Sequence, residues 1–140
     1  MQDYRKLDAW HKSHAFVLRT YAKTENFPRA EVFGITSQMR RAAMSIPANI
    51  AEGCYRGQGS LAQSLRIALG SAGELEYFII LAGDLKLLSD LDRTMLAQEI
   101  ADVKAVVAGL LRSVKVSIEK ERQRKRQTAN GKRQTVNGKR

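Results

Sequence analysis

The chain has 140 residues, of which 44% are apolar, and it carries a formal net charge of +10. This length suits one domain with a single core and excludes two ordinary domains. The longest uninterrupted apolar run, Phe78 to Ala82, is far shorter than the roughly 20 residues that span a bilayer. The N-terminal stretch MQDYRKLDAW lacks the apolar segment of a secretory signal. We therefore expect a cytoplasmic protein without a membrane partner.

The composition favours helices and gives no sign of a cofactor. The chain has only two prolines, and long runs of Ala, Leu, Glu, Lys and Arg are typical of helical proteins. Its one cysteine, Cys54, has no partner for an internal disulfide and no companion ligands for a metal cluster. We expect an all-α protein with a free thiol in a reducing compartment.

The positive charge is concentrated at the C-terminus. Residues 122–140 hold eight basic residues and no acid, so the rest of the chain has 16 basic and 14 acidic residues, a balance of only +2. Such a tail gains counterion-release free energy on a polyanion and predicts sequence-tolerant binding of RNA or DNA. A solubilising extension without a partner is the alternative. The candidate contacts in the tail are Arg122, Arg124, Lys125, Arg126, Lys132, Arg133, Lys139 and Arg140.

Hydrophobic periodicity predicts the first two helices. The first has a stripe at steps of three and four residues, formed by Leu7, Trp10, His14, Val17 and Tyr21. After a connection at 24–30, the second helix is predicted from about Glu31 to Glu52, with a stripe formed by Met39, Ala42 or Ala43, Ile46 and Ile50. Pro47 predicts a kink or a fresh start in it. Gly53 stands where a C-cap is expected, and a loop is predicted at 53–60.

Two longer helices are predicted to follow. The third starts at Ser60 and has a stripe formed by Leu61, Leu65, Ala68 or Leu69, Ala72, Leu75 and Ile79. Its segment ALGSAG, at 68–73, has so little side-chain volume that a close neighbour is expected, either a helix of the same chain or another subunit. After a turn at 89–92, the fourth helix is predicted over 93–121, with a stripe formed by Leu96, Ile100, Val103, Val107, Leu110, Val114 and Ile118.

Four amphipathic helices with short connections predict an up-and-down four-helix bundle over residues 1–121. Residues 122–140 are predicted to be a disordered basic tail, since they contain a twice-repeated unit, QTANGKR and then QTVNGKR, with almost nothing to bury.

The second helix carries the most informative polar residues. Arg40 and Arg41 offer forked guanidinium groups that suit phosphates. The alternative is that at least one of them pairs with a carboxylate such as Glu52, Glu74 or Glu76. Arg56 is a further candidate phosphate contact. Asn49 and Glu52 are expected to close the helix end through hydrogen bonds rather than to act in catalysis.

No set of residues predicts an enzyme or a cofactor. His11 and His14 lie three residues apart, but no further ligand is placed to complete a metal site. The glycine-rich stretch GCYRGQG lacks the lysine and hydroxyl of a phosphate-binding loop. A nucleophile paired with a general base is also missing.

Four separated stretches resemble one known family. QMRRAAMSIPANIAEG at 38–53 resembles the signature of the 23S rRNA intervening-sequence protein family, also called the four-helix bundle protein family. LDAWHK at 7–12, the Phe27–Pro28 pair and IALGSAGELE at 67–76 resemble its other recurring stretches, and the likeness covers about 4–115. The structural signature falls on Asn49, Glu52, Gly53, Gly70 and Glu74.

The resemblance implies an up-and-down bundle assembled as a homo-oligomeric ring of five subunits. The family includes accessory variability determinants of diversity-generating retroelements, which implies nucleic acid and a reverse transcriptase as partners. Two functions follow as hypotheses. In the first, a non-enzymatic accessory protein binds nucleic acid through Arg40, Arg41, Arg56 and the tails. The alternative is a scaffold whose surface of small residues holds a protein partner.

Overall fold

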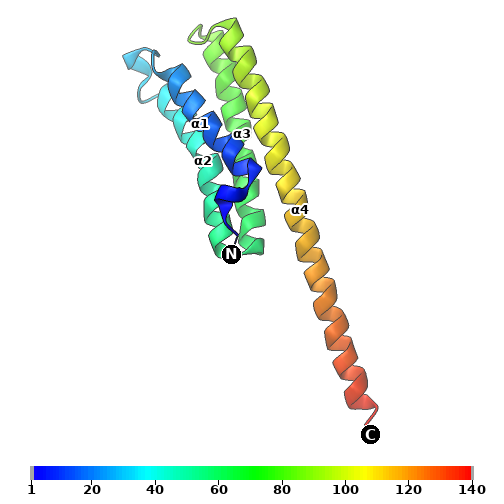
Figure 1. Ribbon diagram of the computed structural model, residues 1–140. Helices are drawn as coiled ribbons and strands as arrows, with labels where there is room; N and C mark the ends of the chain where they lie inside the picture. The colour runs from blue at the N-terminus through cyan, green and yellow to red at the C-terminus, as the bar shows by residue number, and fades with distance from the viewer. Residues whose placement is uncertain (1, 140) are drawn as a thin grey trace.

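The computed structural model describes residues 2–139 and confirms an all-helical chain. No strand occurs in this range. Four α-helices are accompanied by two short 3₁₀ turns (Figure 1). In chain order the elements are η1 (Tyr4–Lys6), α1 (Asp8–Thr24), η2 (Arg29–Glu31), α2 (Ile35–Arg56), α3 (Gln58–Asp84) and α4 (Asp90–Asn137).

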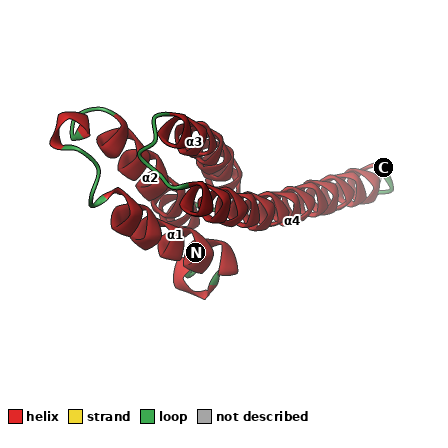
Figure 2. Cartoon of the chain, turned by 90° about the horizontal axis from the view of Figure 1, so that it is seen from above, coloured by secondary structure: helices red, strands yellow, loops and turns green. Residues whose placement is uncertain are grey.

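The four α-helices form an up-and-down bundle. The chain reverses direction at each connection, so that consecutive helices run antiparallel (Figure 1). α1 packs against α2 and α4, and α3 also packs against α2 and α4. Viewed from above, the helices follow one another around a shared core (Figure 2). No helix in the described part of the chain has the length and apolarity needed to cross a membrane.

Most of the core is formed by apolar stripes of the last three helices. In α2, Ile46 and Ile50 are fully buried, as are Leu65 and Leu75 in α3 and Ile100 in α4. Because each fully buried Leu or Ile contributes about 1.5–3 kcal/mol relative to an exposed one, these stripes hold the three helices together. The periodicity prediction is confirmed for α2 and α3. In α4 it is confirmed except at one step, where Leu111 is buried in place of the predicted Leu110, and Ile118 is only half-buried.

The predicted stripe of α1 is wrong. Among the described residues of α1, the buried ones are Ala9, Ser13, Phe16, Val17, Thr20 and Thr24, and Val17 alone belonged to the prediction. The hydroxyl groups of Thr20 and Thr24 enter the core because they donate to the carbonyl oxygens of Phe16 and Thr20, at 2.9 and 2.8 Å. A polar side chain that bonds to its own helix is cheap to bury.

Phe16 is the aromatic residue of α1 that enters the core, whereas Trp10 and His14 lie at its edge. The rings of Trp10 and His14 stack with centroids 4.9 Å apart, and Tyr4 packs against Trp10 at 5.2 Å. Trp10 is only partly buried, while His14 is exposed. The ring of Trp10 is therefore covered mainly by its aromatic neighbours on one side of α1.

The connection between α2 and α3 is much shorter than predicted. α2 continues through Gly53 to Arg56, and α3 begins at Gln58, so Gly57 alone links them. Gly57 has a φ of 98°, a left-handed conformation that favours glycine. Gly53 is instead a buried helical residue: a Cβ there would lie 2.9 Å from the Cα of Leu61. Gly53, the predicted C-cap, is therefore a contact between helices, and Ser60, the predicted start of the third helix, lies inside α3.

Pro47 lies within α2 without ending it. The helix runs from Ile35 to Arg56 with Pro47 buried inside, so the fresh start that was one of the two predicted effects of Pro47 does not occur. Near Pro47, the side-chain amide nitrogen of Asn49 donates to the Ser45 carbonyl oxygen at 2.7 Å and to the Ser45 hydroxyl at 3.0 Å. The Ser45 hydroxyl in turn lies 2.8 Å from that of Ser71 in α3. Asn49 therefore stabilises the middle of α2 instead of closing its end.

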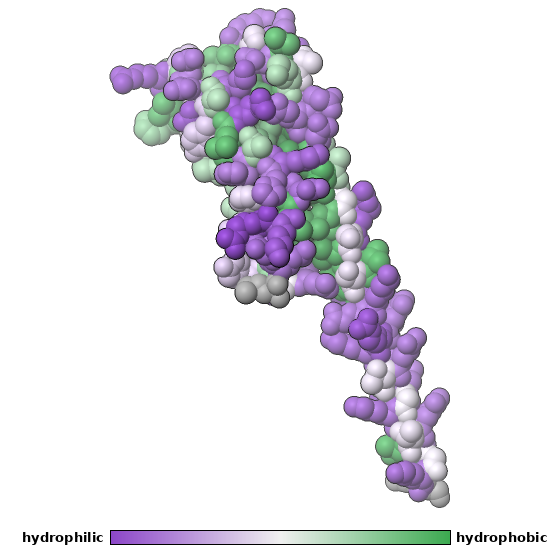
Figure 3. All heavy atoms as spheres, viewed as in Figure 1, coloured by the Kyte–Doolittle hydropathy of each residue, from purple (hydrophilic) through white to green (hydrophobic). Residues whose placement is uncertain are grey.

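α4 is far longer than predicted. Its N-terminus is capped by the Ser89 hydroxyl, which accepts from the Asp92 amide at 3.1 Å, and it continues to Asn137 where a disordered tail was expected. Lys, Arg, Gln and Ala are good helix formers, and a helix already nucleated in the bundle extends at little cost. All residues from 119 to 139 are exposed. We call residues 122–139 the C-terminal arm; it projects beyond the bundle (Figures 1 and 3).

Candidate nucleic-acid interface

Arg40 is part of the packing between α1 and α2. Its Nε donates to the Thr24 hydroxyl at 2.9 Å, and a terminal nitrogen donates to the Tyr21 carbonyl at 3.4 Å. The guanidinium also lies over the Tyr21 ring, 4.4 Å from its centroid. These contacts satisfy the C-terminal end of α1, where carbonyl groups lack helical partners. Arg40 therefore has a structural role and is not held ready for a phosphate.

Arg41 pairs with Glu74, as the structural alternative predicted. The two form an ion pair between α2 and α3, and Arg41 also donates to the Gln38 side chain at 3.1 and 3.2 Å. The side chain of Arg41 is 55% exposed and that of Glu74 is 39% exposed, so the pair contributes less than about 1 kcal/mol. Arg41 is accessible, but a nearby carboxylate already offsets its charge.

The other predicted residues near the end of α2 are also accounted for within the chain. Arg56 pairs with Glu52 one turn earlier, at 2.9 Å on the surface. Gly70 is exposed, and a Cβ there would meet nothing within 4 Å. The close neighbour expected beside the small residues is therefore a helix of the same chain. The Ser71 hydroxyl contacts that of Ser45 in α2, and Ala68 and Ala72 are buried in the core, while no part of the described chain covers Gly70.

The C-terminal arm gathers cations on one side. Its described cations are Arg122, Arg124, Lys125, Arg126, Lys132, Arg133 and Lys139, and no acidic residue lies among them. With about 100° per residue in a helix, the helical ones other than Arg124 lie within an arc of about 120°. Leu111, Val114 and Ile118, which pack α4 on the bundle, fall on the same side. The face of α4 that is apolar within the bundle thus becomes cationic beyond it.

The arm's side chains have few partners in the described chain. Lys125 lies 3.6 Å from Glu121 on the exposed surface, while Arg126, Lys132 and Arg133 have no carboxylate within ion-pair distance in residues 2–139. The arm is hydrophilic over most of the surface that Figure 3 shows. Arg140, also a predicted contact, lies outside the described residues.

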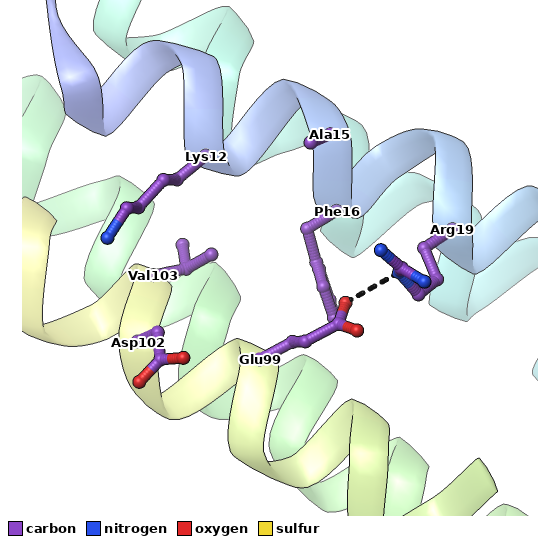
Figure 4. A pocket seen from close by; sticks show the side chains of 7 residues that line it. All are labelled: Lys12, Ala15, Phe16, Arg19, Glu99, Asp102 and Val103. Carbon is purple, nitrogen blue, oxygen red and sulfur yellow. Dashed lines mark ion pairs between the residues drawn. The ribbon is translucent and has the colours of Figure 1, made fainter.

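A groove between α1 and α4 is a weaker candidate site. It has a volume of about 260 Å³, and Phe16 and Val103 form its apolar floor. Lys12 and Asp102 lie at its mouth, and Arg19 pairs with Glu99 at 2.8 Å (Figure 4). Two cations face two carboxylates there, so the groove does not favour a polyanion.

The described residues contain no group of three or more His, Cys, Asp or Glu side chains that could hold a metal ion. His11 does not share a site with His14: its Nε2 lies 2.6 Å from the Arg5 carbonyl oxygen. Cys54 is buried, and this burial raises the pKa of its thiol, which opposes formation of a nucleophilic thiolate. The arrangement offers surface charge and helix contacts rather than an assembled reactive centre.

Comparisons with known proteins agree with the fold. A family model described as 23S rRNA-intervening sequence protein matches residues 5–109. A crystal structure of a protein of unknown function from the S23 ribosomal protein family of Bacteroides thetaiotaomicron is similar, with a TM-score of 0.68. It is 21% identical and covers 74% of this chain and 95% of its own, which supports the fold alone. No curated protein matches. The family model ends before the C-terminal arm. Because it matches most of the bundle and more than half of the chain, the chain belongs to the 23S rRNA-intervening sequence protein family.

Proposed function

We propose that this protein is a non-enzymatic nucleic-acid-binding accessory protein, in which the bundle is a platform and the C-terminal arm contacts the phosphate backbone. The observation that carries the proposal is the cationic face of an exposed helix without acidic residues. Cations fixed on a helix lose less conformational freedom on binding than cations on a flexible chain. The arm therefore suits a regular polyanion such as an RNA or DNA duplex.

The distribution of charge supports the arm over the bundle. Outside residues 122–140 the chain has a balance of only +2. Arg40 is committed to α1, while Arg41 and Arg56 have carboxylate partners. We therefore place the proposed phosphate contacts on the arm rather than on these three residues. Binding should be sequence-tolerant and should weaken steeply with salt, by about 0.9 log units per log unit of salt for each duplex phosphate neutralised.

We also propose that the bundle self-assembles, with five subunits as the state to test first. An exposed strip on α3 supports a subunit contact: Ile67, Tyr77 and Ile80 lie along the same side of the helix as Gly70 and Gly73. Apolar side chains around two uncovered glycines permit close approach of a second helix. An assembly would join several arms and raise their effective concentration on one nucleic acid.

The same strip favours a second candidate function, a scaffold for a protein partner such as a reverse transcriptase. The two functions predict different behaviour, because a scaffold needs the α3 strip but not the charge of the arm. Purified protein that binds neither RNA nor DNA would favour the scaffold.

The test is fluorescence anisotropy with labelled duplex RNA and duplex DNA across a salt series, using the full chain. One variant carries Lys132→Gln, Arg133→Gln and Lys139→Gln in the arm. A matched control carries Lys6→Gln, Lys12→Gln and Arg29→Gln, which remove the same charge from exposed positions on the bundle. The arm variant should lose affinity and reduce the salt slope by up to about 2.7. Equal losses in both variants, or none in the arm variant, would contradict the proposal.

A further inference from the structure

A hollow lies where α4 leaves the bundle. It has a volume of about 370 Å³ and is lined by Gly59, Ala62 and Arg66 of α3 and by Lys115, Ile118, Glu119 and Arg122 of α4. Ala62 is buried and Ile118 is half-buried, while Arg66, Lys115 and Arg122 are exposed. Three cations from two facing helices therefore surround an apolar floor, with Glu119 as the one acidic residue in the lining.

This cluster differs from the other charged contacts between helices of the bundle. In five other places a cation on one helix meets a carboxylate on its neighbour, in the pairs Arg19–Glu99, Lys23–Asp92, Arg41–Glu74, Arg93–Asp84 and Lys104–Glu76. Within residues 2–139, Arg66, Lys115 and Arg122 have no carboxylate within ion-pair distance. Like charges facing each other across a helix interface repel, so the hollow favours an anion between them.

The hollow is continuous with the cationic face of the arm. Lys115, Arg122, Arg126 and Arg133 lie within about 40° of one another around α4, at about 100° per residue. Together they form a row about 27 Å long, at about 1.5 Å per residue. Arg66 of α3 lies across the hollow from Lys115 and Arg122, which form the end of this row nearest the bundle. A phosphate backbone that follows this row along the arm towards the bundle therefore reaches the hollow.

The start of α3 adds positive potential beside these cations. The first backbone hydrogen bond of this helix runs from the Leu61 amide to the Gly57 carbonyl at 2.9 Å, so the amides of residues 58–60 precede it and lack a helical acceptor. The positive end of a helix dipole and its free amides favour anions. Gly59, which lines the hollow, belongs to this first turn.

We propose that this hollow, formed by Arg66, Lys115 and Arg122, binds a backbone phosphate of the nucleic acid that the arm contacts. The inference rests on the proposed function and deepens it, because it gives the bundle a direct contact and fixes the position of the nucleic acid along α4. Arg66 supplies a forked guanidinium from α3, and Lys115 supplies a point charge from α4. The ligand chemistry is a phosphodiester, which RNA and DNA share.

The experiment compares the full chain carrying Arg66→Gln, or Lys115→Gln, with the control Arg29→Gln. Arg29 is an exposed cation of η2, and η2 joins α1 to α2 at the end of the bundle opposite the hollow (Figure 1). The probes are a labelled DNA duplex and the matching RNA duplex. Loss of one phosphate contact should reduce the salt slope by about 0.9, which is about eightfold in affinity at about 0.1 M salt when the contact acts through counterion release. Arg29→Gln should leave both quantities close to those of the unmodified chain. Because Arg66 and Lys115 are exposed, circular dichroism melts should show all three variants folded.

The outcomes separate this inference from the proposed function. If Arg66→Gln and Lys115→Gln behave like Arg29→Gln while the triple variant of the arm loses binding, the hollow is not a phosphate site and the arm remains the interface. If Arg66→Gln weakens binding but the triple variant of the arm does not, the hollow binds nucleic acid and the proposed role of the arm is wrong. Absence of binding to either duplex by the unmodified chain overturns both. Equal losses of affinity for the DNA and RNA duplexes would indicate a phosphate contact that both share, whereas a loss for only one duplex would identify that nucleic acid as the ligand of the hollow.

Discussion

Gly53→Ala should destabilise the protein although it improves helix propensity. Gly53 lies inside α2, where alanine is favoured over glycine by about 1 kcal/mol. The new Cβ, however, would lie 2.9 Å from the Leu61 Cα and from the Ser64 Cβ, and 3.0 Å from the Leu61 Cδ1. A backbone atom and a Cβ cannot rotate away, so α2 and α3 must separate locally. Overpacking of this kind costs about 1–3 kcal/mol.

Gly70→Ala is the matched control, because Gly70 is also a helical glycine but faces open space. A Cβ there would meet nothing within 4 Å. Only the propensity gain remains, so Gly70→Ala should raise the free energy of unfolding by about 0.5–1 kcal/mol. Because the propensity gain offsets part of the overpacking cost, we expect a net decrease of up to about 2 kcal/mol for Gly53→Ala. The two variants should therefore differ by about 2 kcal/mol in opposite directions from the unmodified chain.

Urea unfolding followed by circular dichroism measures both changes, and the midpoint should shift without a change in slope. Thermal melts should agree, with the midpoints of the two variants separated by about 5–10 °C. If Gly53→Ala is as stable as Gly70→Ala, the close approach of α2 and α3 is not limiting and the reasoning is wrong. A series of protein concentrations is needed, since Gly70 lies on the strip proposed for subunit contact and its variant could also weaken assembly.

Three further predictions concern particular side chains. Arg40→Met should lower the free energy of unfolding by about 1–3 kcal/mol, because it removes hydrogen bonds to α1 and the contact with the Tyr21 ring. Arg41→Met should lower it by less than about 1 kcal/mol, since it removes only an exposed ion pair. Equal losses of the two variants in urea unfolding would refute the structural role of Arg40. Ser89→Ala should cost about 0.5–2 kcal/mol by removing the cap of α4, whereas Ser117→Ala at an exposed position of the same helix should not. The buried Cys54 thiol should react with Ellman's reagent only as fast as the protein unfolds, and rapid labelling of folded protein would contradict its burial. Burial also raises the pKa of this thiol above its ordinary value of 9.0. The contribution of the protonated thiol to the free energy of unfolding should therefore be complete below pH 9.0 and be lost as the pH rises through the folded-state pKa.

The helices that the sequence predicts well are those whose cores are aliphatic. Ile46, Ile50, Leu65 and Ile100 repeat at helical spacing, and no polar residue competes with them for the interior. In α1 the same rule selects the wrong face. Thr20 and Thr24 count as polar in a hydrophobicity pattern, yet their hydroxyls are satisfied by their own helix. A pattern of hydrophobicity alone does not distinguish this case from an exposed threonine.

The α2–α3 connection shows how glycines of two kinds look alike in a sequence. Gly53 is required by the close approach of Leu61, and Gly57 by a φ of 98°. Both are single glycines near the end of a predicted helix, so the pattern predicts a cap at the first of them and a loop that begins too early. Only the packed structure shows which glycine carries the turn.

The sequence also predicts the cations of the arm better than those of the hollow. The eight cations at 122–140 adjoin one another in the sequence, so the tail was found, although its helical form was not. Arg66 and Lys115 were missed because they stand on different helices, 49 positions apart, and only the antiparallel packing of α3 and α4 brings them to one hollow. The signal that would have found them is the absence of a carboxylate at the facing positions, which requires the register of the two helices.

The helical form of the arm changes what its charge can do. In a disordered tail, cations adapt to any polyanion, and their spacing carries no information. On α4 the row that starts at Lys115 has fixed intervals of about 10.5, 6 and 10.5 Å, at about 1.5 Å per residue, and it is attached rigidly to the bundle. Its upper end also meets Arg66 across the hollow, so the orientation of the arm relative to α3 becomes part of recognition. A duplex of regular phosphate spacing is a better match for such an array than a compact or irregular anion, which is why the geometry favours nucleic acid over a general affinity for negative charge.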